Sequence, residues 1–309
     1  MAPKLCVGID IGASSVKLCQ LARVKTRQAA IAISGHSVII KKIPLPQMTR
    51  EELEDQIQWE AEQFIPFDIN DVNLDVQIVN PESAQKGHMD VVLVAAKKDY
   101  VNEYTSVVIE AGLEPAVCDI DAFAVQNMFE ANYEMSPEHT YALVNVGAAK
   151  TNINIVARGI SSFTRDLTVG GNTFTEEIQK QLSVTRDEAE QLKLGVMAGA
   201  GTTDAVVPQE VERAMRSVAE SVTTEIQRSI DFYVATSADP APAAIYVSGG
   251  SARLAALTRA LEARMGVQVV VTDPFRQVQV ADGDREYLRS VGPAAAVAVG
   301  LALRFPGDA

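Results

Sequence analysis

The hydrophobic pattern opens with an apolar run, Leu5 to Ile9, that is typical of a buried strand. The next residues, Gly12 to Ser15, have small side chains and predict a tight turn, and a second strand begins at Val16. A turn without large side chains lets backbone N–H groups approach a phosphate closely. A plain hairpin has the same pattern, so this stretch alone does not decide between the two.

The same arrangement of strand, turn and strand returns in the second half of the chain. A strand is predicted from Tyr141 to Val146, then a small-residue turn from Gly147 to Thr151, and two further strands near 153–155 and 160–164. A third turn, Ser248 to Ser251, follows an apolar strand. This repetition suggests an internal duplication, with a ligand held between the two halves.

Helical spacing and strict alternation mark the block between the two copies. A helix is expected near 50–64, after the capping box of Thr49 and Glu52. Alternating residues predict a strand at 72–78, an apolar run predicts another at 91–95, and a helix capped by Asp99 follows.

These elements predict three units. We expect 44–114 to be a small α+β unit inserted into a first domain made of 1–43 and 115–140. The second domain is expected to cover 141–309, with a helical subdomain at about 172–240. That subdomain contains a second capping box at Thr185, a small-residue loop from Gly195 to Pro208, and a long helix near 209–235.

Composition narrows the range of partners. The 309 residues are 47% hydrophobic and have a formal net charge of −13. Nucleic acid and adsorption to an anionic membrane are both disfavoured, because each needs clustered lysine and arginine. The three cysteines, Cys6, Cys19 and Cys118, form no disulfide framework or metal spacing. There is no basic segment followed by an apolar stretch at the N-terminus, and we expect a cytoplasmic protein without direct membrane insertion.

As a set, the three turns and their spacing resemble the actin-like ATPase superfamily. Within it the chain resembles the PilM family, the cytoplasmic actin-like components of the type IV pilus machine, and it is similar to the cell-division protein FtsA. This resemblance is carried by residues 8–12, 15–17, 32–35, 58–67, 119–123, 169–172, 190–193 and 247–251. The segment 58–67 is the most telling, because generic actin-like enzymes lack it. The implied fold is α/β, with two actin-like (ribonuclease H-like) domains around a nucleotide cleft.

The resemblance also implies a site for ATP and Mg²⁺. Asp10 would order the metal through water, with Asp121 near it in the hinge helix. The residues implied to bind the nucleotide are Asp10, Gly12, Ala13, Ser14, Ser15, Lys17, Gly147, Thr151, Gly171, Glu190, Lys193, Gly249, Gly250 and Ser251. For Glu190 and Lys193, which are three residues apart on one helix face, a solvated surface is an equal alternative.

The implied partners are the N-terminal cytoplasmic tail of a PilN-like inner-membrane protein and the pilus motor ATPase. The chain would then be a scaffold in pilus assembly and twitching motility, held peripherally at the inner membrane by its partner. The tail groove is expected near the helix at 50–64, with Trp59, Phe64, Pro66 and Phe67 as candidate contacts. An extended apolar tail would gain affinity there from pockets and backbone pairing. Core packing is the alternative for Phe64 and Phe67.

Two departures from the family pattern affect these expectations. Asn145 stands where active actin-like ATPases usually have Asp, and an amide lacks the negative charge that helps to hold Mg²⁺, so we expect slow or absent hydrolysis. The first half is also short. Only 22–28 separates its second strand from the strand at 29–33, where PilM-like chains carry a third strand and a helix. A natural loss, an engineered deletion and an omitted segment all remain open.

Two other functions remain open. An ATPase or a sugar-kinase-like phosphotransferase on this fold would need a carboxylate base, for which Asp10 and Asp121 are available. A filament-forming role like that of actin rests on the analogy of fold alone.

Overall fold

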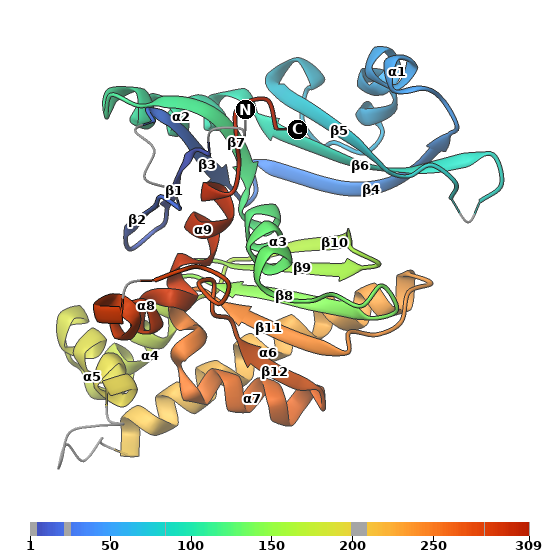
Figure 1. The fold of residues 1–309 in the computed structure, drawn as a ribbon. Helices are drawn as coiled ribbons and strands as arrows, with labels where there is room; N and C mark the ends of the chain where they lie inside the picture. The colour runs from blue at the N-terminus through green and yellow to red at the C-terminus, as the bar shows by residue number, and fades with distance from the viewer. Residues whose placement is uncertain (1–4, 22–25, 84, 199–208, 281, 309) are drawn as a thin grey trace.

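The computed structural model describes residues 5–21, 26–83, 85–198, 209–280 and 282–308. Two lobes, each built on its own sheet, lie one above the other in Figure 1. The first sheet has the order β2-β1-β3-β7. Its strands are β1 (Val7–Ile11), β2 (Val16–Cys19), β3 (Gln28–Ile33) and β7 (Glu114–Ile120).

The second sheet repeats this order and adds one strand. It runs β10-β9-β8-β11-β12, so β8 and β9 correspond to β1 and β2, while β11 and β12 correspond to β3 and β7. No strand in the described part of the first sheet corresponds to β10. The five strands are β8 (Thr140–Val146), β9 (Thr151–Ala157), β10 (Ile160–Leu167), β11 (Ala244–Ser248) and β12 (Gln268–Val271).

Two helices lie between the sheets and belong to a core that both sheets share. These are α3 (Asp121–Asn132) and α9 (Ala296–Ala302), the second of which follows a short 3₁₀ turn, Gly292–Ala295. Their shared core contains Ala30 from the first sheet and Leu143 from the second, packed around Phe129. The outer face of the first sheet packs on α2 (Lys98–Glu110). Because the shared core is continuous, each lobe supports the other.

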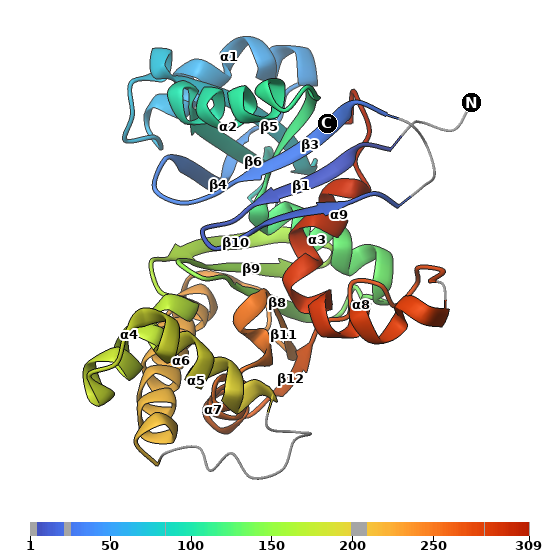
Figure 2. The ribbon, with the colours of Figure 1, turned by 90° about the vertical axis from the view of Figure 1, so that its left-hand side faces the viewer.

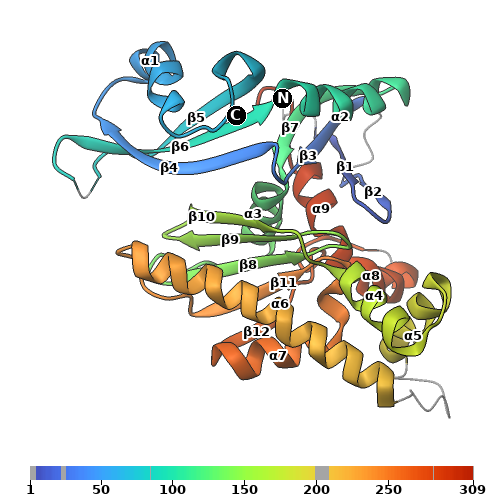
Figure 3. The ribbon, with the colours of Figure 1, turned by 180° about the vertical axis from the view of Figure 1, so that it is seen from behind.

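The outer face of the second sheet is covered by α4 (Gly171–Leu182), α6 (Gln209–Thr236) and α7 (Ala255–Met265). The helix α5 (Arg186–Ala198) contacts α4 and α6, and the short helix α8 (Arg285–Val291) contacts the 3₁₀ turn at Gly292–Ala295. Figure 3 shows α4 and α5 below β2, on the same side of the molecule.

The inserted unit is a three-stranded sheet with one helix on its outer face. The strand order is β4-β6-β5, with β4 at Val38–Pro46, β5 at Val72–Asn80 and β6 at His88–Lys97. The helix α1 (Arg50–Glu62) packs on Leu93 and its neighbours, and a 3₁₀ turn, Ile69–Asp71, precedes β5. The boundary expected at residue 44 falls inside β4, because that strand pairs along its whole length with β6.

Local sequence signals account for most element ends. Both capping boxes form: Thr49 accepts from the backbone N–H of Glu52, and Thr185 accepts from that of Glu188. The predicted Asp99 cap is wrong, because α2 begins one residue earlier and Asp99 lies in its first turn. Of the loop expected at Gly195 to Pro208, the first four residues continue α5 and the rest lies outside the described residues.

Within the described residues, no helix has the length and apolar character needed to cross a membrane. The three cysteines are free thiols. Cys6 is buried, Cys19 half-buried and Cys118 exposed.

Candidate functional site

All three small-residue turns border one cavity of about 740 Å³ between the lobes. In Figure 2 the hairpin that joins β1 and β2 reaches toward the second sheet, and the turn after β8 lies below it. The residues on the cavity wall that the sequence had indicated are Asp10, Gly12, Ala13, Ser14, Ser15, Lys17, Asp121, Gly147, Gly171, Glu190, Lys193, Gly249, Gly250 and Ser251. Thr151 is not among them, because its side chain is buried and its hydroxyl donates to the carbonyl of Val169.

The first two turns close in the same way. The N–H of Gly12 donates to the carbonyl of Ser15 at 3.1 Å, and the N–H of Gly147 donates to the carbonyl of Lys150 at 2.9 Å. The third turn depends on Gly249, which has a φ of +89°. A Cβ there would lie 2.3 Å from the carbonyl oxygen of Val146. The turn can therefore reach the end of the sheet only with glycine at this position.

Asp10 already has a cationic partner on the strand that follows the first turn. It pairs with Lys17 across the β1–β2 ladder, and the ammonium donates to its carboxylate at 3.0 Å. Burial raises the pKa of Asp10, against the opposing effect of Lys17. In the second domain the same ladder position holds Asn145 opposite Asn152, with a hydrogen bond of 3.1 Å between their amides.

Asp121 begins α3 at the floor of the cavity. The hydroxyl of Ser34 donates to its carboxylate at 2.5 Å. Burial raises the pKa of Asp121 to about 6, although the bond from Ser34 opposes the change. A carboxyl group with this pKa exchanges a proton near neutral pH, as a general base does.

Glu190 and Lys193 are not on a solvated helix face, since Lys193 is only 8% exposed. The Lys193 ammonium lies 2.7 Å from the Glu190 carboxylate and donates to the carbonyl of Gly171 and the hydroxyl of Thr175. Burial alone would raise the pKa of Glu190, but the bonds from Lys193 and Thr175 outweigh it and lower that pKa. This cluster joins α4 to α5 at the cavity wall.

Two cations of the second domain also line the cavity, and sequence reasoning did not single them out. Lys150 donates to the carbonyl of Ser34 at 2.9 Å, across the gap between the lobes. Arg186 donates to the side chain of Asn172 at 3.0 Å. Only their positions in the sequence could have indicated these two residues. Lys150 directly precedes Thr151 in the second turn, and Arg186 is the first residue of α5.

These side chains fit a Mg²⁺ ion poorly. Asp10 is paired with Lys17, Asp121 accepts from Ser34, and the strand before the second turn offers the neutral amide of Asn145. The described residues include no cluster of three or more His, Cys, Asp or Glu that could hold a metal. A magnesium ion at Asp10 would have to displace the ammonium group of Lys17.

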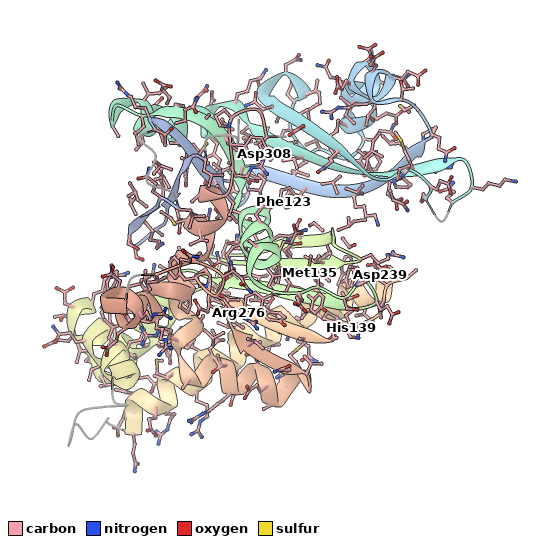
Figure 4. The ribbon with its side chains drawn as sticks, viewed as in Figure 1. Phe123, Met135, His139, Asp239, Arg276 and Asp308 are labelled. Atoms are coloured by element: carbon pink, nitrogen blue, oxygen red, sulfur yellow. The ribbon has the colours of Figure 1, made fainter. Side chains whose placement is uncertain are left out.

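A second cavity of about 610 Å³ lies below the inserted sheet. Its walls are formed by β5, the end of β7, α3 and the β9–β10 turn, and Figure 4 labels Phe123 near the start of α3, just below that sheet. Both β5 and β7 are edge strands of their sheets. Three buried side-chain atoms on this wall have no hydrogen-bond partner among the described residues: Asp119 Oδ2, Asn127 Nδ2 and Arg304 Nε.

The four expected partner contacts lie away from this cavity. Phe64 and Phe67 pack, half-buried, against the core under α1. Pro66 is exposed, and Trp59 is 77% exposed on α1. Figure 1 shows α1 on the face of the inserted sheet that points away from the second domain.

Comparison with known proteins agrees with this architecture. A family model described as type IV pilus assembly protein PilM matches residues 17–305. A chain of a solved PilM–PilN type IV pilus biogenesis complex is 28% identical, with 98% of this chain and 99% of that chain covered and a TM-score of 0.83.

The ethanolamine utilization protein EutJ of Carboxydothermus hydrogenoformans shares the fold at 16% identity, with 98% of this chain and 90% of that chain covered and a TM-score of 0.55. The actin-like fold predicted from the three turns is confirmed by these matches. Because the family model spans nearly the whole chain, the chain belongs to the PilM family of type IV pilus assembly proteins.

Proposed function

We propose that this protein is a nucleotide-binding scaffold of the type IV pilus inner-membrane platform. It would recruit the cytoplasmic tail of a PilN-like membrane protein and pass its own state to the motor ATPase. The observation that carries this proposal is that two cavities meet at the connection between β7 and α3. Asp119, at the end of β7, lines the second cavity, and Asp121, two residues later, lines the cleft. Only Ile120 separates them, so a change at either cavity would be passed to the other through this residue.

The proposed ligand of the cleft is ATP. Backbone turns without bulky side chains face the cavity from both lobes, as a polyphosphate requires. Slow or absent hydrolysis is expected, because the strand before the second turn presents the amide of Asn145, whose oxygen accepts from the hydroxyl of Ser248 at 3.3 Å. An actin-like ATPase or phosphotransferase with its own turnover remains the second candidate, and the raised pKa of Asp121 favours it. Steady phosphate release by the pure protein, abolished by Asp121→Asn, would establish that second candidate.

The proposed site for the tail is the second cavity. An extended peptide can add to an exposed strand edge, and here two such edges border one groove. The face of the inserted sheet turned toward it carries Val92, Val94 and Ala96, the residues that alternate with the core under α1. Asp119 and Arg304, 3.6 Å apart, would find partners in peptide N–H and C=O groups. Such a partner would hold the protein peripherally at the inner membrane.

A binding assay separates this groove from the α1 face expected from the sequence. We would measure the anisotropy of a fluorescent PilN-type tail peptide with the wild type, Phe123→Ala and Trp59→Ala. Loss of a half-buried aromatic contact should weaken binding about tenfold or more for Phe123→Ala. Trp59→Ala should bind like the wild type. The reverse pattern would locate the tail on the α1 face, and no effect of either variant would contradict both sites.

A further inference from the structure

The cleft is positively charged in a protein that is strongly acidic overall. The full chain has a formal net charge of −13, yet the charged side chains on the cleft wall are three anions and four cations. The anions are Asp10, Asp121 and Glu190, and the cations are Lys17, Lys150, Arg186 and Lys193. A cavity with this balance favours a polyanion.

Two of the three carboxylates are already neutralised by a lysine. Asp10 pairs with Lys17 at 3.0 Å, and Glu190 pairs with Lys193 at 2.7 Å. Among the described residues, Lys150 and Arg186 form no ion pair within 4.0 Å. These two side chains are therefore the cations of the cleft wall that remain available to a ligand.

The position of Lys150 is built into both lobes. It comes from the second-domain turn, and its ammonium crosses to the carbonyl of Ser34 in the first lobe. Gly35, with a φ of +100°, leaves room for it, since a Cβ there would lie 2.6 Å from Lys150 Nζ. An ammonium group has three N–H bonds, and the carbonyl of Ser34 takes one. No other acceptor in the described part of the chain takes the remaining two.

We propose that Lys150 holds the terminal phosphates of a nucleoside triphosphate and makes Mg²⁺ dispensable for binding. This inference rests on the proposed nucleotide function and assigns it a further ligand residue. The neutral amide of Asn145 helps phosphate binding because it does not repel the phosphates. A carboxylate at that position would repel them unless a cation lay between the two. The Lys150 ammonium, held in place by the carbonyl of Ser34, then supplies positive charge that a divalent ion supplies elsewhere.

Equilibrium titration of the full chain with ATP, in excess EDTA and again in excess Mg²⁺, tests this inference. Wild-type affinity in EDTA should stay within about tenfold of that in Mg²⁺, since a charge-assisted hydrogen bond retains ~1.5–3 kcal/mol. Lys150→Gln should weaken ATP binding in EDTA by about 10- to 100-fold and leave AMP binding unchanged. The matched control is Lys180→Gln, on the exposed surface of α4, which should bind like the wild type.

A second variant tests the inference without removing the hydrogen bond between Lys150 and the carbonyl of Ser34. Asn145→Asp restores a negative charge, so its ATP affinity should fall about tenfold in EDTA and recover in Mg²⁺. If the wild type binds ATP only in Mg²⁺, or if Lys150→Gln binds ATP in EDTA as well as Lys180→Gln does, this inference is wrong while the nucleotide function stands. If the wild type binds ATP under neither condition, both fail.

Discussion

Single residues decide whether the third turn can exist. Gly249 has a positive φ, and the carbonyl of Val146 occupies the place where its Cβ would lie. The neighbouring Gly250 has open space at the corresponding point and no positive φ. The pair therefore offers a matched comparison within one turn.

Gly249→Ala should lower the free energy of unfolding by about 2–4 kcal/mol, from the left-handed backbone and the clash together. Gly250→Ala should change it by less than about 1 kcal/mol. Urea denaturation without nucleotide measures both, so effects on ligand binding do not enter. Equal stability of the two variants would mean that the turn has another geometry.

The effect of Asp121 on stability should depend on pH. Its pKa rises from 3.8 to about 6 on folding because burial disfavours the charged form. The folded state therefore binds the proton more tightly, and this group costs stability as the pH rises from 4 through 6. Asp121→Asn should match the wild type near pH 4 and exceed its stability above pH 6.5, by up to about 3 kcal/mol before screening by cleft water.

Urea denaturation at several pH values, with the exposed Asp231→Asn on α6 as control, measures this difference. The control should show no such pH-dependent gain. A constant offset between Asp121→Asn and the wild type at all pH values would show that Asp121 titrates alike in both states.

The edge strand β2 exposes apolar side chains to solvent. In the second sheet the corresponding strand, β9, pairs with β10, whereas the described part of the first sheet has no strand there. Val16 and Leu18 on β2 are 57% and 65% exposed. An apolar strand with a free edge is a template for pairing with another chain.

Leu18→Lys should therefore reduce concentration-dependent association, because a charge on an edge strand opposes pairing. Light scattering over a range of protein concentrations measures this effect. Val107→Lys is the control, since Val107 is 54% exposed on helix α2 and has no strand edge to offer. If both variants reduced association equally, surface hydrophobicity in general, and not the β2 edge, would be responsible.

Local signals predicted the elements well and the contacts between distant elements poorly. The capping boxes at Thr49 and Thr185 and the repeated turns follow from short-range chemistry, so they were readable along the sequence. The helix α8, with no buried residue to set a helical period, was missed. Lys150 was also missed as a cleft residue, because its role depends on a carbonyl 116 positions earlier in the chain.

The two lobes are joined so closely that the molecule should respond to a ligand as one unit. The N–H of Gly35 donates to the carboxylate of Asp166, and the side chain of Asn154 donates to the carbonyl of Ala122. The shared core around α3 and α9 adds apolar contacts with both sheets. Even the C-terminal segment, where Arg304 pairs with Asp308, lies beside β7 (Figure 4).

Scanning calorimetry should therefore show one main transition, and ATP should move all of it. A ligand at 100 times its dissociation constant adds about 2.7 kcal/mol to the folded state, which is about 4 °C in Tm for a chain of this length. AMP at the same concentration should shift the transition less, because it cannot bridge the turns of both lobes. Two transitions, with only one responding to ATP, would mean that the nucleotide contacts a single lobe and that the three turns do not form one site.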